Sequence, residues 1–429
     1  AANECGAAGG ANAVITCSSD KPTGVTYNSL QGATVTLASP SMEIGYAWYN
    51  FSFTGVKLTS SGGNALTLNA DSYDRIYWPV VLQGDGAVAA NFSGGEVRGG
   101  VLATANIVVT LAAGGTADHI GTVNLDGTTV SIGSALTPGT SAVIVNGNAD
   151  GSEMAATITG GSSVSIGGNN AFGVRLTGSG VGNTGSVTVD GASQITASNS
   201  VNIDISNPGL HKATAISVET SGASSMGYVS LSGDADVSAS ATNAINLALS
   251  TGVSNKAGDG GVQTIVDNAS LSSTATSLET STAFGIDNQS VGGVAEATVK
   301  GAGSVSAAAE TYTILGSGVQ ASATAIRNAS DTQNAFVSVT EGGTLVSEAN
   351  GEEAYATASG ILNTAGLEAA VRVDTGSTVD ANATSTDSYA VATAIENRAE
   401  TDARIRVRGG STITATATGA ASAGLGGFA

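Results

Sequence analysis

The sequence predicts an all-β chain coiled into a parallel β-solenoid behind an N-terminal cap. Copies of one unit lie 34 residues apart, anchored at Val339, Val373 and Val407. A second phrase, ending at Asn363 and again at Asn397, keeps the same period. A fixed period of this length is typical of stacked repeats. Apolar residues alternate with Ser, Thr and Asn, as in half-buried strands, and no segment has the spacing of an amphipathic helix.

The repeat can be traced toward the N-terminus by an apolar anchor, a short turn and a second apolar residue six positions later. The pairs that fit are Ile158/Val164, Val189/Ile195, Leu231/Val237, Ile265/Leu271 and Val299/Val305. Successive anchors lie 31 to 42 residues apart. The longer steps contain additional Asn, Gly and Pro, as at residues 207–209, so we expect loops that leave one face of the solenoid.

Each unit is expected to form one coil of three short strands. In the last full copy these strands are predicted near residues 370–374, 377–384 and 389–397. Alternation turns five side chains of this coil inward: Val371, Val373, Val379, Ala381 and Ala383. It turns five others outward: Arg372, Asp374, Thr378, Asp380 and Asn382. Parallel pairing of neighbouring coils then places Arg372 beside Arg406, and Asp374 beside Arg408.

Residues 1–100 are predicted to form the cap and the first coils, and residues 101–429 the regular repeats. Residues 33–37 and 46–53 alternate as strands do, whereas residues 71–79 are expected to form a loop. Ten of the chain's eighteen aromatic residues lie in the first segment. Five of them are candidate ligand-binding residues: Tyr46, Trp48, Tyr49, Tyr77 and Trp78. A plug at the open end of the solenoid is the favoured role, and a platform for sugars is the alternative.

The chain carries 34 acidic and 14 basic residues, a net charge of −20. This charge disfavours nucleic acid and anionic membranes as partners. Hydrophobic residues make up 41% of the chain, which argues against disorder. No run of 18 apolar residues suggests a transmembrane helix.

The two cysteines, Cys5 and Cys17, both lie near the N-terminus. We expect them to form a disulfide that closes a small loop at the cap, in an oxidising compartment. A metal site is disfavoured because neither histidine, His119 or His211, lies beside them in the sequence. We therefore expect no metal and no cofactor.

No catalytic motif is found, so we expect a protein that is not an enzyme. The sequence lacks Gly-x-Ser-x-Gly, His-Glu-x-x-His and P-loop patterns. Residues 180–185 match Gly-x-Gly-x-x-Gly in letters, but a strand-like run follows instead of a helix. Residues 146–151 resemble half of a calcium loop, whose twelfth position is Thr157 rather than Glu.

Four asparagines each follow an inward isoleucine by two residues. They are Asn288, Asn328, Asn363 and Asn397. Alternation turns each amide inward as well. Amides stacked at the coil spacing can bond to one another and to turn backbone, so we predict a structural ladder.

The chain resembles the passenger domain of an autotransporter from a Gram-negative bacterium. The resemblance lies in the opening Cys5…Cys17, the composition rich in Gly, Ser, Thr, Asn, Ala and Val, and the recurrent Val-x-Val-x-x-Gly-Ser-x-Val/Ile phrases. It implies a right-handed parallel β-helix that is exported through a C-terminal outer-membrane β-barrel, which this sequence lacks. We expect a released or truncated passenger, which opens on Ala1-Ala2-Asn3 as a mature product does once its signal peptide is removed.

The resemblance further implies an extracellular protein at the bacterial cell surface that acts in adhesion, autoaggregation, biofilm formation or virulence. Its partners would be host or bacterial cell-surface molecules, or other copies of itself. A polysaccharide-degrading β-helix enzyme is the alternative, and a groove lined by several carboxylates would favour it. A purely structural spacer or filament subunit is the third hypothesis.

Overall fold

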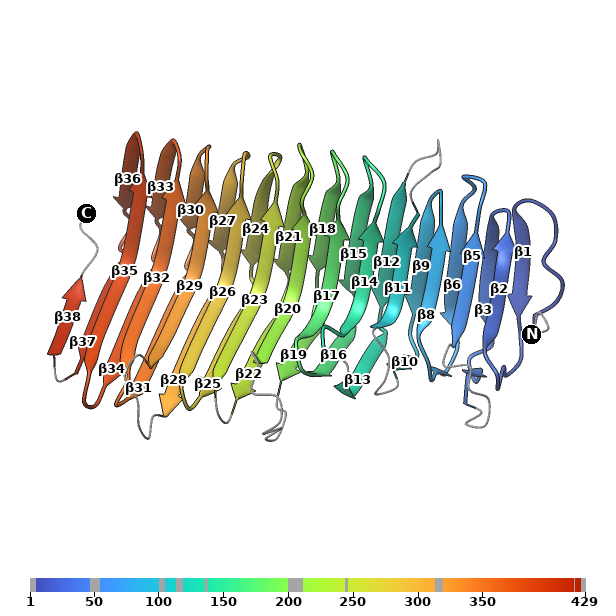
Figure 1. Ribbon diagram of the computed structural model, residues 1–429, viewed down its shortest axis with the longest axis horizontal. Coiled ribbons are helices and arrows are strands. Elements are labelled where there is room, and N and C mark those ends of the chain that lie inside the picture. Colours follow the sequence, from blue (N-terminus) through green and yellow to red (C-terminus); the bar gives the residue numbers. More distant parts are fainter. Residues whose placement is uncertain are drawn as a thin grey trace.

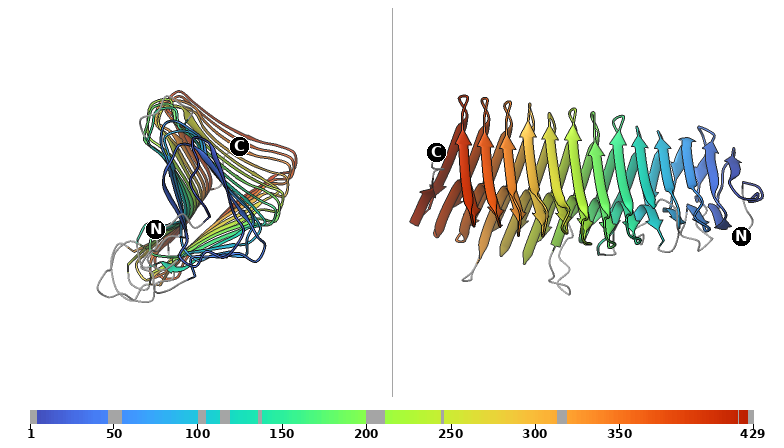
Figure 2. Two further views of the ribbon diagram at one scale, coloured as in Figure 1. Left: turned by 90° about the vertical axis from the view of Figure 1, so that its right-hand side faces the viewer. Right: turned by 90° about the horizontal axis from the view of Figure 1, so that it is seen from above.

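The chain folds as a right-handed parallel β-helix, the fold class that the sequence predicts (Figure 1). The computed structural model describes residues 5–46, 55–99, 105–112, 119–135, 138–199, 211–243, 246–312, 319–419 and 421–425. These residues form strands and turns and no helix, so they contain no helical segment that could cross a membrane. Seen down the long axis, the coils superpose in a three-sided outline (Figure 2).

Three sheets, A, B and C, form the sides, with 13, 12 and 13 strands within the described residues. Sheet A contains β1 (Ala13–Cys17), β3 (Ala33–Ala38), β6 (Leu66–Ser72), β9 (Val88–Ser93), β12 (Ile120–Asp126), β15 (Glu153–Thr159), β18 (Thr184–Val189), β21 (Met226–Ser232), β24 (Gly261–Asp267), β27 (Ala295–Lys300), β30 (Ala335–Val339), β33 (Glu368–Val373) and β36 (Asp402–Val407).

Sheet B contains β4 (Glu43–Ile44), β7 (Arg75–Ile76), β10 (Glu96–Gly99), β13 (Thr129–Ala135), β16 (Ser163–Gly168), β19 (Gln194–Asn199), β22 (Asp236–Asn243), β25 (Ser270–Ser277), β28 (Ser304–Tyr312), β31 (Thr344–Glu352), β34 (Thr378–Ser385) and β37 (Thr412–Thr418). Sheet C contains β2 (Val25–Leu30), β5 (Val56–Ser60), β8 (Val80–Gly84), β11 (Ala105–Leu111), β14 (Ser141–Gly147), β17 (Ala171–Gly178), β20 (His211–Thr220), β23 (Leu247–Ala257), β26 (Thr280–Ser290), β29 (Gln320–Ser330), β32 (Tyr355–Ala365), β35 (Tyr389–Ala399) and β38 (Ala421–Leu425).

One coil corresponds to one repeat, because from β3 onward the chain visits sheets A, B and C in turn. The three strands predicted in the last full copy are β33, β34 and β35. Arg372 on β33 pairs directly with Arg406 on β36, as the 34-residue register predicts. The backbone N–H of Arg408 donates to the carbonyl of Val373 at 2.9 Å, so the same register continues into the turn.

Alternation along each strand separates the interior from the surface. The five side chains predicted to face inward in the last full copy are all at most 1% exposed. The five predicted to face outward are half-buried or exposed. Interior size changes along the stack, since the twelve largest fully buried side chains all lie between Leu30 and Leu125. Later coils bury mostly alanine and valine, such as Ala381 and Val379.

The predicted anchor Ile265 is wrong by one residue. Leu231 pairs with Val266, which in turn pairs with Val299. Val266 is fully buried, whereas Ile265 faces outward and is half-buried. The turn after β24 is one residue shorter than its neighbours, and Asn268 closes it with a positive φ of 52°.

The first segment differs from the sequence prediction at residues 71–79, where a loop was expected. The loop predicted there is wrong in part, because residues 71 and 72 extend β6 and β7 lies inside it. Arg75 and Ile76 form β7 because they pair with Glu43 and Ile44 of the preceding coil, a partner that the local pattern does not reveal. Most of the strand predicted at residues 46–53 lies outside the described residues, and Tyr46 itself is not in a strand.

Candidate functional site

The predicted asparagines lie on four successive strands of sheet C: β26, β29, β32 and β35. Each side-chain Nδ2 donates to the Oδ1 of the next amide, at 3.3, 2.8 and 2.8 Å from Asn288 to Asn397. Asn288, Asn328 and Asn363 are fully buried. The four side chains therefore form one hydrogen-bonded chain along the solenoid axis.

Asn255 on β23 occupies the position before Asn288 in the same register. Its Nδ2 lies 3.4 Å from Thr264 Oγ1, and Thr264 donates to Asn288 Oδ1 at 2.7 Å. The predicted set misses Asn255 because Val253 replaces the isoleucine two residues before it. The pattern of any inward β-branched residue followed two positions later by Asn includes it.

The ladder also bonds to the backbone of sheet A. Successive Nδ2 groups lie 2.6, 3.2, 3.4 and 3.1 Å from the carbonyl oxygens of Glu296, Phe336, Ala370 and Arg404, respectively. Those four residues pair in register across β27, β30, β33 and β36, and we call them the ladder row. Their side chains point outward, and their backbone carbonyl groups accept hydrogen bonds from the asparagine amides on the inner side of the sheet.

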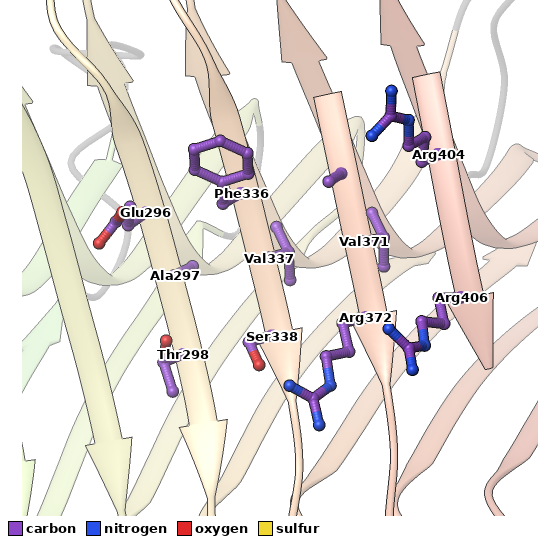
Figure 3. Close-up of a pocket in the computed structure, with 11 residues that line it drawn as sticks. Glu296, Ala297, Thr298, Phe336, Val337, Ser338, Val371, Arg372, Arg404 and Arg406 are labelled. Atoms are coloured by element: carbon purple, nitrogen blue, oxygen red, sulfur yellow. The ribbon is translucent and has the colours of Figure 1, made fainter. Parts of the chain in front are cut away.

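A second outward row runs beside the ladder row, two residues further along the same strands. It contains Thr298, Ser338, Arg372 and Arg406, and we call it the arginine row. The two rows line a depression of about 390 Å³ on the outer face of sheet A (Figure 3). This volume lies in the range of small-ligand sites.

The depression forms where the small side chains of Ala370 and Ser338 lie among larger side chains of the two rows. Phe336 and Arg404 flank Ala370 in the ladder row, and Arg372 stands across from it. On β30, the side chain of Ser338 in the arginine row is small, whereas that of Phe336 in the ladder row is large. Figure 3 shows Phe336 at one side of the hollow, and Arg372 and Arg406 leaning toward the preceding coils.

The charges of the depression are unevenly paired. Arg372 Nη2 lies 2.8 Å from Asp374 Oδ2, and this guanidinium lowers the pKa of the Asp374 carboxyl below its ordinary value. Arg404 forms an ion pair with Asp402. Within the part of the chain that the structure describes, Arg406 has no acidic partner at ion-pair distance.

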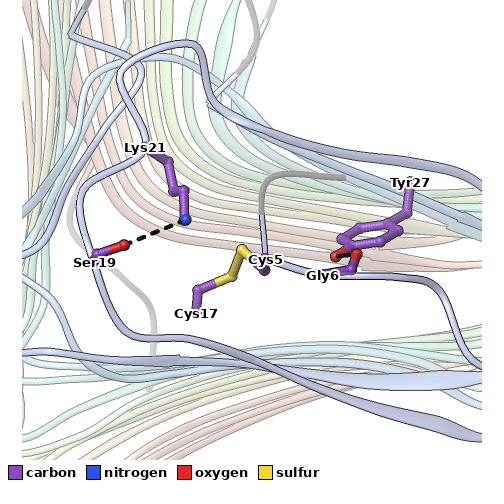
Figure 4. Close-up of a disulfide and its surroundings, with 6 residues drawn as sticks. All are labelled: Cys5, Gly6, Cys17, Ser19, Lys21 and Tyr27. Atoms are coloured by element: carbon purple, nitrogen blue, oxygen red, sulfur yellow. Dashed lines mark hydrogen bonds between the residues drawn. A yellow bond between two sulfur atoms is a disulfide. The ribbon is translucent and has the colours of Figure 1, made fainter. Parts of the chain in front are cut away.

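The predicted disulfide is present between Cys5 and Cys17, whose Cα atoms are 4.9 Å apart (Figure 4). Cys17 is the last residue of β1 and is 1% exposed. Next to the bond, the Tyr27 hydroxyl donates to the carbonyl of Gly6 at 2.9 Å. Burial raises the pKa of the Tyr27 phenol. The disulfide therefore ties the start of the chain to the first strand of sheet A.

The structure does not gather the predicted aromatic residues into one described platform. Trp48 and Tyr49 lie outside the described residues. Tyr46 is 38% exposed, and the Tyr77 hydroxyl donates to Glu43 Oε1 at 2.9 Å. Trp78 packs closely on Gly45, where an added Cβ would lie 2.9 Å from the indole Cδ1. Among the described aromatic residues of the first hundred, those that fill the interior are Tyr27, Tyr73 and Phe92, all at most 4% exposed.

The described residues contain no group of three or more His, Cys, Asp and Glu side chains able to hold a metal ion. His211 is 7% exposed, and its Nδ1 lies 3.2 Å from the carbonyl of Thr242. The four threonines of β37 face solvent, but Asp380 and Asn382 occupy two of the equivalent positions on β34.

The structure thus defines the chain as a right-handed parallel β-helix with a ladder-supported depression on one face. Comparisons with family models, with curated proteins and with solved structures found no match.

Proposed function

We propose that the chain is an extracellular bacterial surface protein that acts as an adhesin or self-associating passenger domain. Its partners would be surface molecules of host or bacterial cells, or other copies of itself, and its outcome would be cell adhesion, autoaggregation or biofilm formation. Export through an outer-membrane β-barrel belongs to the same proposal. The autotransporter resemblance and the disulfide at the N-terminal end support it, because disulfides persist in oxidising, extracellular environments.

The observation that carries the proposal is the outer face of sheet B. Short hydroxyl side chains stand there in one row over four successive coils: Thr196, Ser238, Ser272 and Ser306. Neighbouring positions in such a row are separated by the strand spacing of about 4.8 Å. A flat face with hydrogen-bonding groups at regular intervals suits contact with another extended surface.

A display experiment tests the proposal. The chain is anchored on the surface of a cell that does not aggregate, and displaying cells are mixed with fluorescent cells that carry the anchor alone. Clusters made of displaying cells only would indicate self-association, and mixed clusters would indicate binding to another surface molecule. Absence of both aggregation and adhesion to host cells would refute the proposal.

Matched variants locate the contact face. Ser238→Lys with Ser272→Lys places two cations on the outer face of sheet B. Thr282→Lys with Ser322→Lys places two cations at paired outer positions of sheet C. We expect the first double variant to reduce clustering strongly and the second to leave it unchanged. Equal loss in both would show that added charge, rather than the sheet B face, controls clustering.

A further inference from the structure

The depression on sheet A concentrates positive charge in an acidic protein. The chain has 14 basic residues against a net charge of −20, yet three arginines border this one hollow. Five of the 14 lie between residues 372 and 408. The same segment holds six acidic residues, whereas the rest of the chain holds 28 acidic residues against 9 basic ones, so this segment is nearly neutral in a strongly acidic chain.

Arg372 and Arg406 stand directly opposite each other on neighbouring strands. Like charges in this arrangement repel, and strand pairing holds their backbones about 4.8 Å apart. Asp374 neutralises Arg372 in part, but Arg406 has no such partner among the described residues. An anion seated between the two guanidinium groups would relieve the repulsion and gain charge-assisted hydrogen bonds.

The surrounding groups indicate what the anion is attached to. Asp374 and Asp402 pair with Arg372 and Arg404, and Glu296 also lines the hollow, so the three carboxylates balance the three arginines. Arg406 is the arginine without an ion-pair partner among the described residues, and a single free guanidinium favours a monoanion over a phosphate dianion. Phe336 is half-buried and offers an aromatic surface to an apolar ring face. Ser338 and Thr298 provide hydroxyl groups on the neighbouring positions.

We propose that the depression binds a carboxylated sugar residue of an acidic polysaccharide. The carboxylate would lie between Arg372 and Arg406, and one face of the sugar ring would lie against Phe336. Hydroxyl groups of the sugar would bond to Ser338 and Thr298. The ladder positions this site, since its amides hold the carbonyls of Phe336, Ala370 and Arg404. The inference goes beyond the proposed adhesion, because it concerns sheet A and a defined ligand class.

Calorimetric titration of the purified chain with tetragalacturonic acid tests the site. Galactose tetramers serve as the neutral probe and dextran sulfate as the sulfated one. We expect Arg406→Gln to weaken binding of tetragalacturonic acid about tenfold, as loss of one charge-assisted contact would. Phe336→Ala should weaken binding of both the acidic and the neutral sugar.

Arg398→Gln is the matched control. Arg398 is paired with Glu396 on β35, and its side chain is 74% exposed outside the depression. Removing its charge should change the affinity less than twofold. Both glutamine variants alter exposed side chains, and their circular dichroism spectra should match that of the parent chain.

Three results would overturn the inference: no binding of tetragalacturonic acid, equal weakening by Arg398→Gln, or tighter binding of dextran sulfate that Arg406→Gln leaves unchanged. The titration needs no cells, so its outcome is separate from the display experiment. Cells that adhere while the purified chain ignores the acidic sugar would retain the proposed function and refute this site. Binding of the sugar without adhesion of the displaying cells would support this site and refute the proposed function.

Discussion

Asn363 lies in the middle of the ladder, where one side chain connects two sheets. Its Nδ2 lies 3.0, 3.4 and 2.8 Å from oxygens of Ala335, Ala370 and Asn397, and its Oδ1 accepts from Asn328 at 2.8 Å. The side chain is fully buried. Such a buried amide contributes to the stability of the fold mainly because its hydrogen-bond partners cannot bond to water instead when it is removed.

Asn363→Leu should lower the free energy of unfolding by about 1 to 3 kcal/mol, because buried partners lose their hydrogen bonds. Asn382→Leu is the control, since that amide lies on the outer face of β34 and should change stability by less than about 0.5 kcal/mol. Chemical denaturation followed by circular dichroism measures both. Equal stability of the two variants would contradict a structural ladder.

Asp85 joins two coils through the backbone. Its carboxylate accepts hydrogen bonds from the N–H groups of Gly62 and Gly63, at 2.8 and 2.9 Å. The bond from Gly63 has the largest effect in lowering the pKa of Asp85, and the bond from Gly62 acts in the same direction. A depressed folded pKa means that the charged form stabilises the fold.

The contribution of Asp85 should be fully present above its unfolded pKa of about 3.9 and lost as the pH falls through the lower folded value. Asp85→Asn should therefore be less stable than the parent by about 1 kcal/mol at pH 7, and the difference should shrink below about pH 4. Urea unfolding at several pH values between 7 and 2 measures this. A difference that does not change with pH would show that the carboxylate charge is not involved.

At the scale of single strands, β24 tests which side chain faces the interior. Val266 is fully buried and Ile265 is half-buried on the outer side. Val266→Thr should lower the free energy of unfolding by about 1 to 3 kcal/mol, because it buries a hydroxyl group without a hydrogen-bond partner. Ile265→Thr should cost less than about 1 kcal/mol. Thermal unfolding of the two variants gives the order, and the reverse order would restore Ile265 as the anchor.

The first strand depends on the disulfide more than any later strand does. Within the described residues, β1 pairs with β3 alone, and Cys17 at its end is bonded to Cys5. Replacing both cysteines by serine should remove about 3 kcal/mol from this end in the chain-entropy model. Because coils contact only their neighbours, the loss should remain local.

Amide hydrogen exchange measures how far that loss extends. In the double serine variant, exchange should accelerate in β1 and β3 and stay unchanged in β30 and β33. The distant strands are the internal control. Equal acceleration in all strands would mean that the solenoid unfolds as one unit from this end.

At the scale of the whole molecule, the repeat makes the length of the protein adjustable in steps of one coil. Deleting residues 340–373 joins Val339 to Asp374 and removes 34 residues, one complete turn through the three sheets. The remaining coils keep their pairing, and the solenoid becomes shorter by about 4.8 Å. We expect a β-sheet spectrum and cooperative unfolding like those of the parent.

Deleting residues 340–356 is the control, because it removes 17 residues, half of one coil. This deletion joins β30 of sheet A directly to β32 of sheet C and so disrupts the stacking of the coils. That variant should unfold at a clearly lower temperature or fail to fold. Equal melting temperatures for the two deletions would show that the 34-residue register is not what determines the stacking.

The sequence alone was sufficient for the fold class, the coil period and the inward face of the regular coils. Alternation in β33 and β34 is local, because each peptide step turns the next side chain to the other face. Wherever turns keep one length, as from Val339 to Val407, the period also aligns neighbouring coils. The four ladder asparagines lie 40, 35 and 34 residues apart, so the isoleucine two positions before each, rather than a constant spacing, was what placed Asn288, Asn328, Asn363 and Asn397 on one line.

Only the tertiary structure decided the places where turns change length and where a surface is shared by several coils. Ile265 and Val266 are both apolar and β-branched, so only pairing with Leu231 and Val299 shows which one lies inside. The 34-residue period places Phe336, Ala370 and Arg404 side by side, but it does not show that their side chains border a hollow. The hollow depends on the positions of side chains from several coils, which only the tertiary structure shows.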